Sequence, residues 1–218
     1  MKPRGELRAL KPGVTVIAVA GDISTQAGRS SALAAHEHFD ILVNYASGPP
    51  PGDFREWDRD TWLKALDANM LSPIEMIKAT VDGMAERGFG RTINITSSAV
   101  NSPIESLGLS NGALSALTGF IAGLARQENI ASRDMTINNL LPGSFDTDRL
   151  RDNLIAAAEE LGQDNEAFLT ECRQDIPAKR FGSSQELGAL CAFLCSIHAG
   201  YLTGQNLLID GGAIRSSL

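Results

Sequence analysis

Small residues, most of them polar, follow four apolar and β-branched runs of this sequence. They are Asp22 after residues 14–20, Asn44 and Ala46 at the end of residues 40–44, Ser97 after residues 92–96, and Pro142, Gly143 and Thr147 after residues 135–141. A hydroxyl or amide group in such a position can orient a substrate or polarise a carbonyl group by donating a hydrogen bond. These residues therefore predict one shared site, provided that the four runs are neighbouring strands.

The apolar runs alternate with segments of helical periodicity. Helices are predicted over residues 24–38, 60–87, 107–128, 148–162, 164–175 and 184–196, and a fifth strand over residues 205–209. Strands that alternate with helices form a parallel sheet covered on both faces, so we predict a three-layer α/β/α fold in a single domain, residues 1–218. Ligands of such sheets bind beyond the carboxyl ends of the strands, where the small residues stand.

Composition narrows the possible partners. The 218 residues carry a net charge of −7, and only 6% of them are aromatic, which argues against nucleic acid and against an anionic membrane as partner. No run of about 18 apolar residues predicts a membrane span. Three cysteines without a disulfide pattern favour a cytoplasmic setting. The three histidines have spacings that predict no metal site.

A series of motifs, in a consistent order along the chain, resembles the short-chain dehydrogenase/reductase family. The motifs are Ala20-Gly21-Asp22-Ile23, residues 40–48 (Asp-Ile-Leu-Val-Asn-Tyr-Ala-Ser-Gly), Asp67-Ala68-Asn69, Asn94-Ile95-Thr96-Ser97, residues 141–147, residues 180–182 and residues 201–212. The resemblance covers nearly the whole chain. It implies a Rossmann-like, doubly wound parallel sheet, NAD or NADP as cofactor, and ketone or alcohol chemistry on a small-molecule substrate.

The resemblance also assigns roles to single residues. These roles are catalysis for Ser97 and Asn69, adenine contact for Asp22, cofactor lining for Asn44 and Ala46, and nicotinamide contact for Pro142, Gly143 and Thr147. Residues 148–178 would form a lid over the substrate. Helices 60–87 and 107–128 would pair between subunits, so the family pattern implies a homodimer or a homotetramer.

The predicted helix 107–128 departs from the family pattern at two positions. The family carries Tyr-x-x-x-Lys there, whereas this chain has Ser110 at the tyrosine position and Leu114 at the lysine position. In the family the lysine charge lowers the pKa of the tyrosine, which otherwise titrates near ~10. Ser110 is a candidate hydrogen-bond donor but a much weaker acid, and Leu114 supplies neither charge nor hydrogen bond. We therefore expect impaired or absent hydride transfer.

The beginning of the sequence also departs from the family. No glycine-rich turn of the kind that holds the cofactor phosphates precedes residue 14. The run 14–20 corresponds to the third strand of the family, so we expect the first βαβ unit to be lacking. Without that unit, the neighbouring strands must meet directly or leave exposed edges that favour association.

Each candidate residue also has a structural explanation. These explanations are backbone bonding for Asn69, loop capping for Ser97, helix capping for Asp22 and Thr147, a loop glycine for Gly143, and close helix packing for Ser110. Tyr45 is a candidate replacement for the missing acid, although the alternation of strand side chains favours a packing role. The charged run 146–152 is interpreted mainly as a solvated helix face.

Three functions remain open at this point. The first is an NAD(P)-linked oxidoreductase that is impaired or inactive in this form. The second is a non-catalytic relative that acts through oligomerisation or ligand binding. The third is non-redox chemistry of the kind found in halohydrin dehalogenases, which resemble this family. The third is disfavoured because those enzymes keep a tyrosine and an arginine that this chain lacks at the expected positions.

Overall fold

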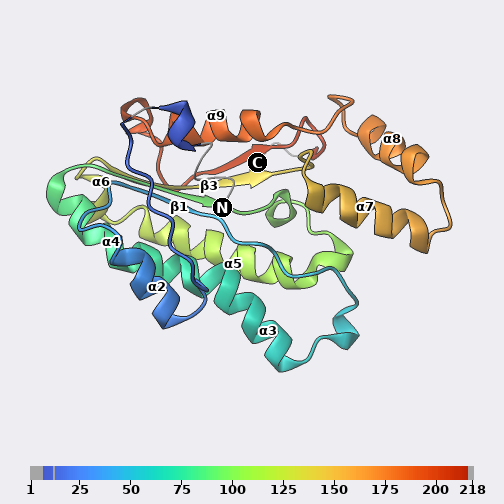
Figure 1. Cartoon of the computed structure of the whole chain (residues 1–218), viewed down its shortest axis with the longest axis horizontal. Coiled ribbons are helices and arrows are strands. Elements are labelled where there is room, and N and C mark those ends of the chain that lie inside the picture. Colours follow the sequence, from blue (N-terminus) through green and yellow to red (C-terminus); the bar gives the residue numbers. More distant parts are fainter. Residues whose placement is uncertain (1–6, 12, 216–218) are drawn as a thin grey trace.

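The computed structural model describes residues 7–11 and 13–215, which form layers around a parallel β-sheet (Figure 1). The strands are β1 (Ile41–Asn44), β2 (Gly90–Ile95), β3 (Met135–Pro142) and β4 (Asn206–Ile209). Their order in the sheet is β1-β2-β3-β4, and every neighbouring pair is parallel. The carboxyl ends of the strands therefore meet at one edge of the sheet, as predicted.

Helices cover both faces of this sheet. Helices α4 (Ser72–Arg87) and α5 (Gly108–Leu124) pack against one face, and α9 (Ser184–Leu194) packs against the other. Figure 1 shows α9 above the sheet and α4 and α5 below it. Further helices are α2 (Gln26–Leu33), α3 (Arg59–Leu66), α6 (Glu128–Ala131), α7 (Asp148–Glu160) and α8 (Asn165–Asp175). The predicted Rossmann-like α/β class is confirmed.

Apolar side chains fill the space on both faces of the sheet. The cluster toward α4 and α5 includes Ile77, Met84, Leu117, Ile121 and Ile137, and the cluster toward α9 includes Ile93, Leu140 and Leu194. The central strands β2 and β3 are buried almost throughout their length. Burial on both faces is the normal state of a central parallel strand, and it makes these two strands a rigid base for the site.

The segment predicted as one helix over residues 60–87 contains two helices. A π-helical turn, Asp67–Leu71, separates α3 from α4. Pro73 stands in the first turn of α4 and lacks the N–H that would continue the helical hydrogen bonds of the preceding turn, so the helix changes its pattern there. Gly88 then ends α4 in the left-handed conformation, with φ 73°. The π turn is a feature that periodicity alone did not predict.

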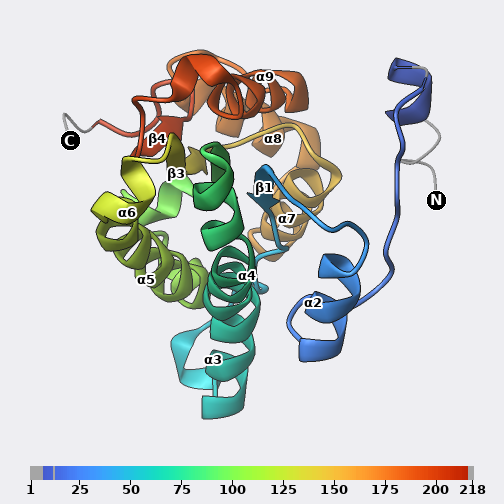
Figure 2. The same cartoon turned by 90° about the vertical axis from the view of Figure 1, so that its left-hand side faces the viewer.

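The first predicted strand, residues 14–20, is not a strand in the structure. Val14, Ile17 and Val19 are 45%, 54% and 43% exposed, and the segment has no regular secondary structure. Figure 2 shows it running well apart from the sheet. A strand needs a neighbour that satisfies its backbone N–H and C=O groups, and no described residue supplies one here. The sheet therefore has four strands among the described residues and not the predicted five.

Strand β1 is consequently an edge strand. It pairs with β2 on one side, and its residues Ile41 and Val43 are 45% and 46% exposed. The expectation of an exposed edge is therefore confirmed within the described ranges. The helix predicted over residues 24–38 is also shorter than expected, since α2 begins after its N-cap Thr25 and ends at Leu33.

One helical stretch in the described part of the chain, Glu105–Leu124, is long and apolar enough to cross a membrane by length and composition. It consists of α5 and the turn before it. Three of its apolar side chains, Leu109, Leu117 and Ile121, are buried in the protein. A core helix of an α/β fold has the same composition.

Candidate active site

Four asparagines form a ladder across the sheet near its carboxyl edge. Asn44 Nδ2 donates to Asn94 Oδ1 at 2.9 Å, Asn94 Nδ2 to Asn139 Oδ1 at 3.0 Å, and Asn139 Nδ2 to Asn206 Oδ1 at 2.8 Å. The strand register places these four residues side by side. Asn94 and Asn139 are 1% exposed, so their amides depend on these bonds. The ladder holds the strand ends, and with them the site, in one register.

Asn69 lies in the π-helical turn and is 4% exposed. Its Nδ2 donates to the backbone oxygen of Ala65 at 3.2 Å. This is the backbone hydrogen bond that the sequence analysis gave as a structural role for Asn69. It also lines a cavity of 220 Å³, together with Asn44, Ala46 and Leu114. Leu114 presents an apolar side chain to this cavity, and its place at the family's lysine position stays a prediction. π turns are frequent at functional sites, so both explanations of Asn69 are compatible with the structure.

Ser97 and Ser110 come from two elements that pack on each other. Ser97 Oγ accepts the N–H of Ala99 at 3.1 Å and caps the 3₁₀ turn Ser98–Val100, against which α5 packs. This bond leaves the hydroxyl hydrogen of Ser97 free to donate. Ser110, in the first turn of α5, is 7% exposed. A Cβ on Gly48 would lie 3.2 Å from Ser110 Oγ, so the loop after β1 passes directly over this hydroxyl.

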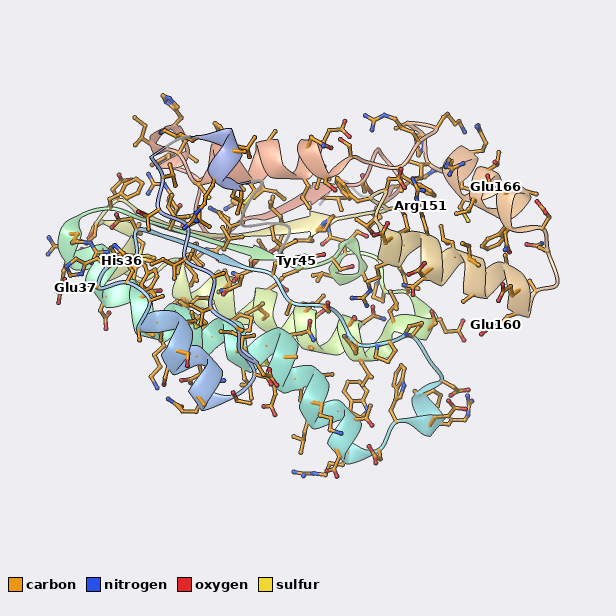
Figure 3. All side chains as sticks on the ribbon, viewed as in Figure 1. His36, Glu37, Tyr45, Arg151, Glu160 and Glu166 are labelled. Carbon is orange, nitrogen blue, oxygen red and sulfur yellow. The ribbon has the colours of Figure 1, made fainter. Side chains whose placement is uncertain are left out.

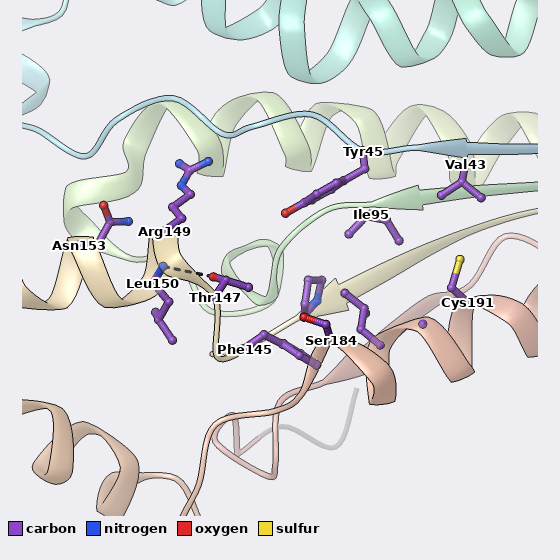
Figure 4. A pocket seen from close by; sticks show the side chains of 14 residues that line it. Val43, Tyr45, Ile95, Phe145, Thr147, Arg149, Leu150, Asn153, Ser184 and Cys191 are labelled. Atoms are coloured by element: carbon purple, nitrogen blue, oxygen red, sulfur yellow. Dashed lines mark hydrogen bonds between the residues drawn. The ribbon is translucent and has the colours of Figure 1, made fainter. Parts of the chain in front are cut away.

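A larger cavity, of 560 Å³, opens at the carboxyl ends of the strands (Figure 4). Its walls come from β1, β2, the end of β3 and the segment after it, and from residues of α7 and α9. The predicted residues Pro142, Gly143 and Thr147 all line it. Thr147 Oγ1 accepts the N–H of Leu150 at 3.2 Å, so Thr147 is the N-cap of α7, as its structural explanation proposed. A Cβ on Gly143 would lie 2.7 Å from Asp210 Cβ, which explains a glycine there.

Tyr45 lies between the two cavities and lines both. Its side chain is 75% exposed, and Figure 4 shows the ring extending from the end of β1 with its hydroxyl toward the side of Thr147 and Arg149. The packing role that strand alternation predicted is therefore wrong. The reason is that Tyr45 follows Asn44, the last paired residue of an edge strand, so no neighbouring strand or helix covers it.

Asp22 is held in its own turn. Its Oδ1 accepts the N–H of Ser24 at 2.9 Å and the hydroxyl of Ser24 at 2.7 Å, and these bonds hold the pKa of Asp22 below its usual range. Thr25 is the N-cap of α2, so the suggestion that Asp22 caps this helix is wrong. The next residue, Ile23, lines the smaller cavity, whereas Asp22 lines neither cavity.

The charged run 146–152 divides into two parts. Arg151 Nε and Asp146 Oδ1 pair at 2.7 Å on the surface, which lowers the pKa of Asp146 and matches the predicted solvated face. Figure 3 places Arg151 on α7, near Glu166 of α8. Arg149 is different, because it lines the larger cavity and its Nη2 donates to Gly48 O at 2.9 Å. The sequence feature that could have identified Arg149 is its position in the first turn of the helix that follows a strand end.

Helices α7 and α8 pack on each other beyond the carboxyl edge of the sheet (Figure 1). Leu169, Ile176 and Phe181 form a buried cluster there, against which Leu150 of α7 packs. The two helices match the segment 148–178, which was predicted as a lid. That this segment covers a bound substrate stays a prediction.

No group of histidine, cysteine and carboxylate side chains within residues 7–11 and 13–215 could hold a metal ion. Cys191 lines the larger cavity from α9 and is half-buried, as is Cys195 one turn later. A hydrogen bond between the two thiols lowers the pKa of Cys191 to about 7 and raises that of Cys195. Both cysteines pack against the apolar cluster beneath α9.

The larger cavity fits the nicotinamide end of a dinucleotide. Ile95 and Leu187 offer apolar walls for a planar ring, and the Thr147 hydroxyl can donate to a carboxamide. The described residues do not form a site for the phosphate groups of the dinucleotide. A Cβ on Gly28 would lie 1.9 Å from Asp22 O, so the first turn of α2 is closed by its own loop. Leu114 also cannot bond a ribose hydroxyl.

A parallel sheet covered by helices on both faces, with cavities at its carboxyl edge, places this protein in the Rossmann-like class of α/β proteins. A family model described as "Enoyl-(Acyl carrier protein) reductase" matches residues 6–213. The chain belongs to the short-chain dehydrogenase/reductase family.

Similar proteins include acetoacetyl-CoA reductase of Cupriavidus necator, 33% identical over 175 residues, and the NADPH-dependent reductase BacG of Bacillus subtilis, 29% identical over 215 residues. The matches cover 79% and 97% of this chain. They span 65% of the first relative and 82% of the second. Among solved structures, YwfH, an NADPH-dependent reductase involved in bacilysin biosynthesis, superimposes with a TM-score of 0.89 at 29% identity. That match covers 99% of this chain and 84% of YwfH.

Proposed function

We propose that this chain belongs to an NADPH-linked reductase that converts a carbonyl group of a small molecule into an alcohol. One observation carries the proposal. Tyr45 lines two adjoining cavities at the carboxyl edge of the sheet, of which the larger fits the nicotinamide ring, and Asn69 lines the smaller one. Ser97 and Ser110 line neither cavity. Ser97 caps the 3₁₀ turn, and Ser110 lies on α5, which packs against that turn and against the π turn of Asn69. The similarity to proteins named as reductases supports the same class of chemistry.

The proposed roles use the groups that remain free in the structure. NADPH supplies the hydride when it is bound. Ser97 donates its free hydroxyl hydrogen to the substrate carbonyl oxygen and polarises it. As the carbonyl oxygen becomes an alkoxide, Tyr45 gives it a proton and regains one from water, since its side chain is 75% exposed. Ser110 orients the substrate, and Asn69 maintains the π turn beside the smaller cavity.

The proposed reaction is slow. A tyrosine titrates near ~10 in water, and an efficient general acid has a pKa closer to the working pH. Leu114 leaves the smaller cavity without a cation of the kind that the family's lysine supplies beside its tyrosine. We therefore expect measurable turnover at a rate below that of a protein with the complete tyrosine and lysine pair.

The test combines binding with turnover. Calorimetric titration measures the affinity for NADPH and NADH, and the loss of NADPH absorbance with a panel of ketones measures kcat. We expect Tyr45→Phe and Ser97→Ala each to lower kcat about tenfold or more without changing the NADPH affinity. Tyr201→Phe is the matched control, because Tyr201 is fully exposed and lines neither cavity. Absence of NADPH binding at millimolar concentration, or an undiminished kcat in Tyr45→Phe, would contradict the proposal.

We also propose a homodimer or homotetramer that forms through α3, α4 and α5, within a reducing compartment such as the cytoplasm. Leu63 of α3, Leu71 of the π turn and Phe120 of α5 are 39%, 45% and 40% exposed and offer apolar contact area. The three cysteines are free thiols. Sedimentation equilibrium should show an oligomer that Phe120→Asp weakens. A monomer at micromolar concentration would refute the interface.

A further inference from the structure

Arg149 is the one charged residue that lines the larger cavity within the described part of the chain. The other lining residues are apolar or neutral polar, so the guanidinium determines the electrostatic character of the cavity. Arg149 is exposed, and a ligand can therefore reach it. Figure 4 shows its side chain extending from the start of α7 along the side of the cavity next to Tyr45 and Thr147.

The loop that follows β1 holds the guanidinium of Arg149 in place. Arg149 Nη2 donates to Gly48 O at 2.9 Å and to Pro49 O at 3.3 Å, across about a hundred residues of sequence. No described carboxylate lies within ion-pair distance of Arg149, whereas Arg151 two residues later pairs with Asp146. The Nε and Nη1 groups of Arg149 donate to no described acceptor and keep their hydrogens for a ligand.

Gly48 brings this cation next to Ser110. A Cβ atom on Gly48 would lie 3.3 Å from Arg149 Nη2 and 3.2 Å from Ser110 Oγ. Glycine therefore leaves room between a hydroxyl group and a guanidinium group at the same end of the site. A molecule that presents its carbonyl group near Ser110 can place a second group, a few bonds away, against Arg149.

We propose that Arg149 is a specificity-determining residue that binds a carboxylate group on the carbonyl substrate, so that the substrates are oxo acids. The inference rests on the proposed reductase function. A guanidinium that is anchored on one side and free on the other matches a carboxylate, because charge-assisted bonds to arginine are strong and directional. The phosphates of the cofactor are the other source of anionic oxygens, and the two sources are separated experimentally below.

The test compares acids with their uncharged esters. The probes are levulinate and 3-benzoylpropionate, each against its methyl ester, titrated by calorimetry with the whole chain in low salt. We expect both acids to bind about tenfold or more tightly than their esters. Arg149→Met should remove this preference without changing ester affinity, and Arg149→Lys should restore part of it. Arg151→Gln, on the same helix, is the control that leaves the preference unchanged.

Each outcome decides the assignment. Equal binding of acid and ester by the unaltered chain overturns it, and so does an acid preference that survives in Arg149→Met. A loss of NADPH affinity in Arg149→Met as large as the loss of acid affinity assigns Arg149 to the cofactor phosphates and also overturns it. An inactive chain that still prefers acids refutes the reductase but supports the assignment. Turnover with equal kcat/KM for acid and ester supports the reductase and refutes the assignment of Arg149.

Discussion

At the scale of single residues, this site keeps hydrogen-bonding groups, carries the Arg149 guanidinium at its larger cavity and has no charged residue among the described residues that line its smaller cavity. Ser97 and Asn69 lie where the family resemblance implied catalytic residues, and their structural bonds leave groups free for a ligand. Ser110 and Leu114 lie on the same helix, where Leu114 lines the smaller cavity beside Asn69. We propose that the impaired chemistry is local to these two positions of α5.

Restoring those two positions together should restore activity. In Ser110→Tyr with Leu114→Lys, the lysine would enter the smaller cavity near Asn44 and Asn69 and lower the pKa of the new tyrosine. We expect ketone-dependent NADPH oxidation to rise about a hundredfold or more. Initial rates between pH 6 and 10 measure this.

Leu114→Lys alone is the control, because it supplies the charge without the phenol group, and it should give a much smaller gain. Circular dichroism verifies that the variants fold. A folded double variant with unchanged activity would mean that these positions are not those of the family's tyrosine and lysine.

At the scale of elements, the asparagine ladder is the device that aligns the strand ends. Asn139→Leu would remove its central member and leave the buried Asn94 amide without an acceptor. We expect this change to lower the free energy of unfolding by about 2 kcal/mol. Asn206→Ala, at the exposed end of the ladder, should cost less than about 1 kcal/mol. Urea denaturation measures both, and equal effects would show that the ladder has no special role.

Helix α9 carries a pH-dependent cap at its beginning. Glu186 accepts hydrogen bonds from Arg180 and from the N–H of Ser183, and these bonds lower its pKa from 4.5 to about 2. A carboxyl group with a lowered pKa stabilises the fold above its ordinary pKa, and this stabilisation is lost as the pH falls toward the folded value. The effect should therefore fade between pH 4.5 and pH 2.

Glu186→Gln should remove that part of the acid sensitivity. Its Tm should lie below that of the unaltered chain at pH 7, and the gap should narrow as the pH falls below 4.5. Thermal unfolding followed by circular dichroism at several pH values measures this. A gap that stays constant with pH would show that the Glu186 charge is unimportant for the cap.

At the scale of the whole molecule, the middle of the sheet is buried and its β1 edge is open. Strands β2 and β3 are covered on both faces, whereas β1 is an edge strand and residues 14–20 run well apart from the sheet without pairing. The chain also spans only part of the length of its relatives. Among the described residues, the β1 edge is therefore a place where the sheet can still gain a partner.

Hydrogen exchange should reveal this asymmetry. We expect the amides of residues 14–20 to exchange within seconds and those of β2 and β3 to be protected for hours or longer, because only the latter are buried and bonded. Mass spectrometry of peptic peptides makes the comparison in one experiment. Strong protection of residues 14–20 would mean that they pair with a second copy or with another segment.

The sequence by itself determined the alternation of strands and helices, the four strands that pair and the family, because these depend on local periodicity and on the order of short motifs. The tertiary structure decided the rest. Residues 14–20 read as a strand locally, but a strand forms only beside a partner. The asparagine ladder and the positions of Tyr45 and Arg149 at the larger cavity depend on segments 40 to 100 residues apart being brought together. No periodicity within a single segment contains that information, which is why the residue proposed to select the substrate looked like part of a solvated helix face.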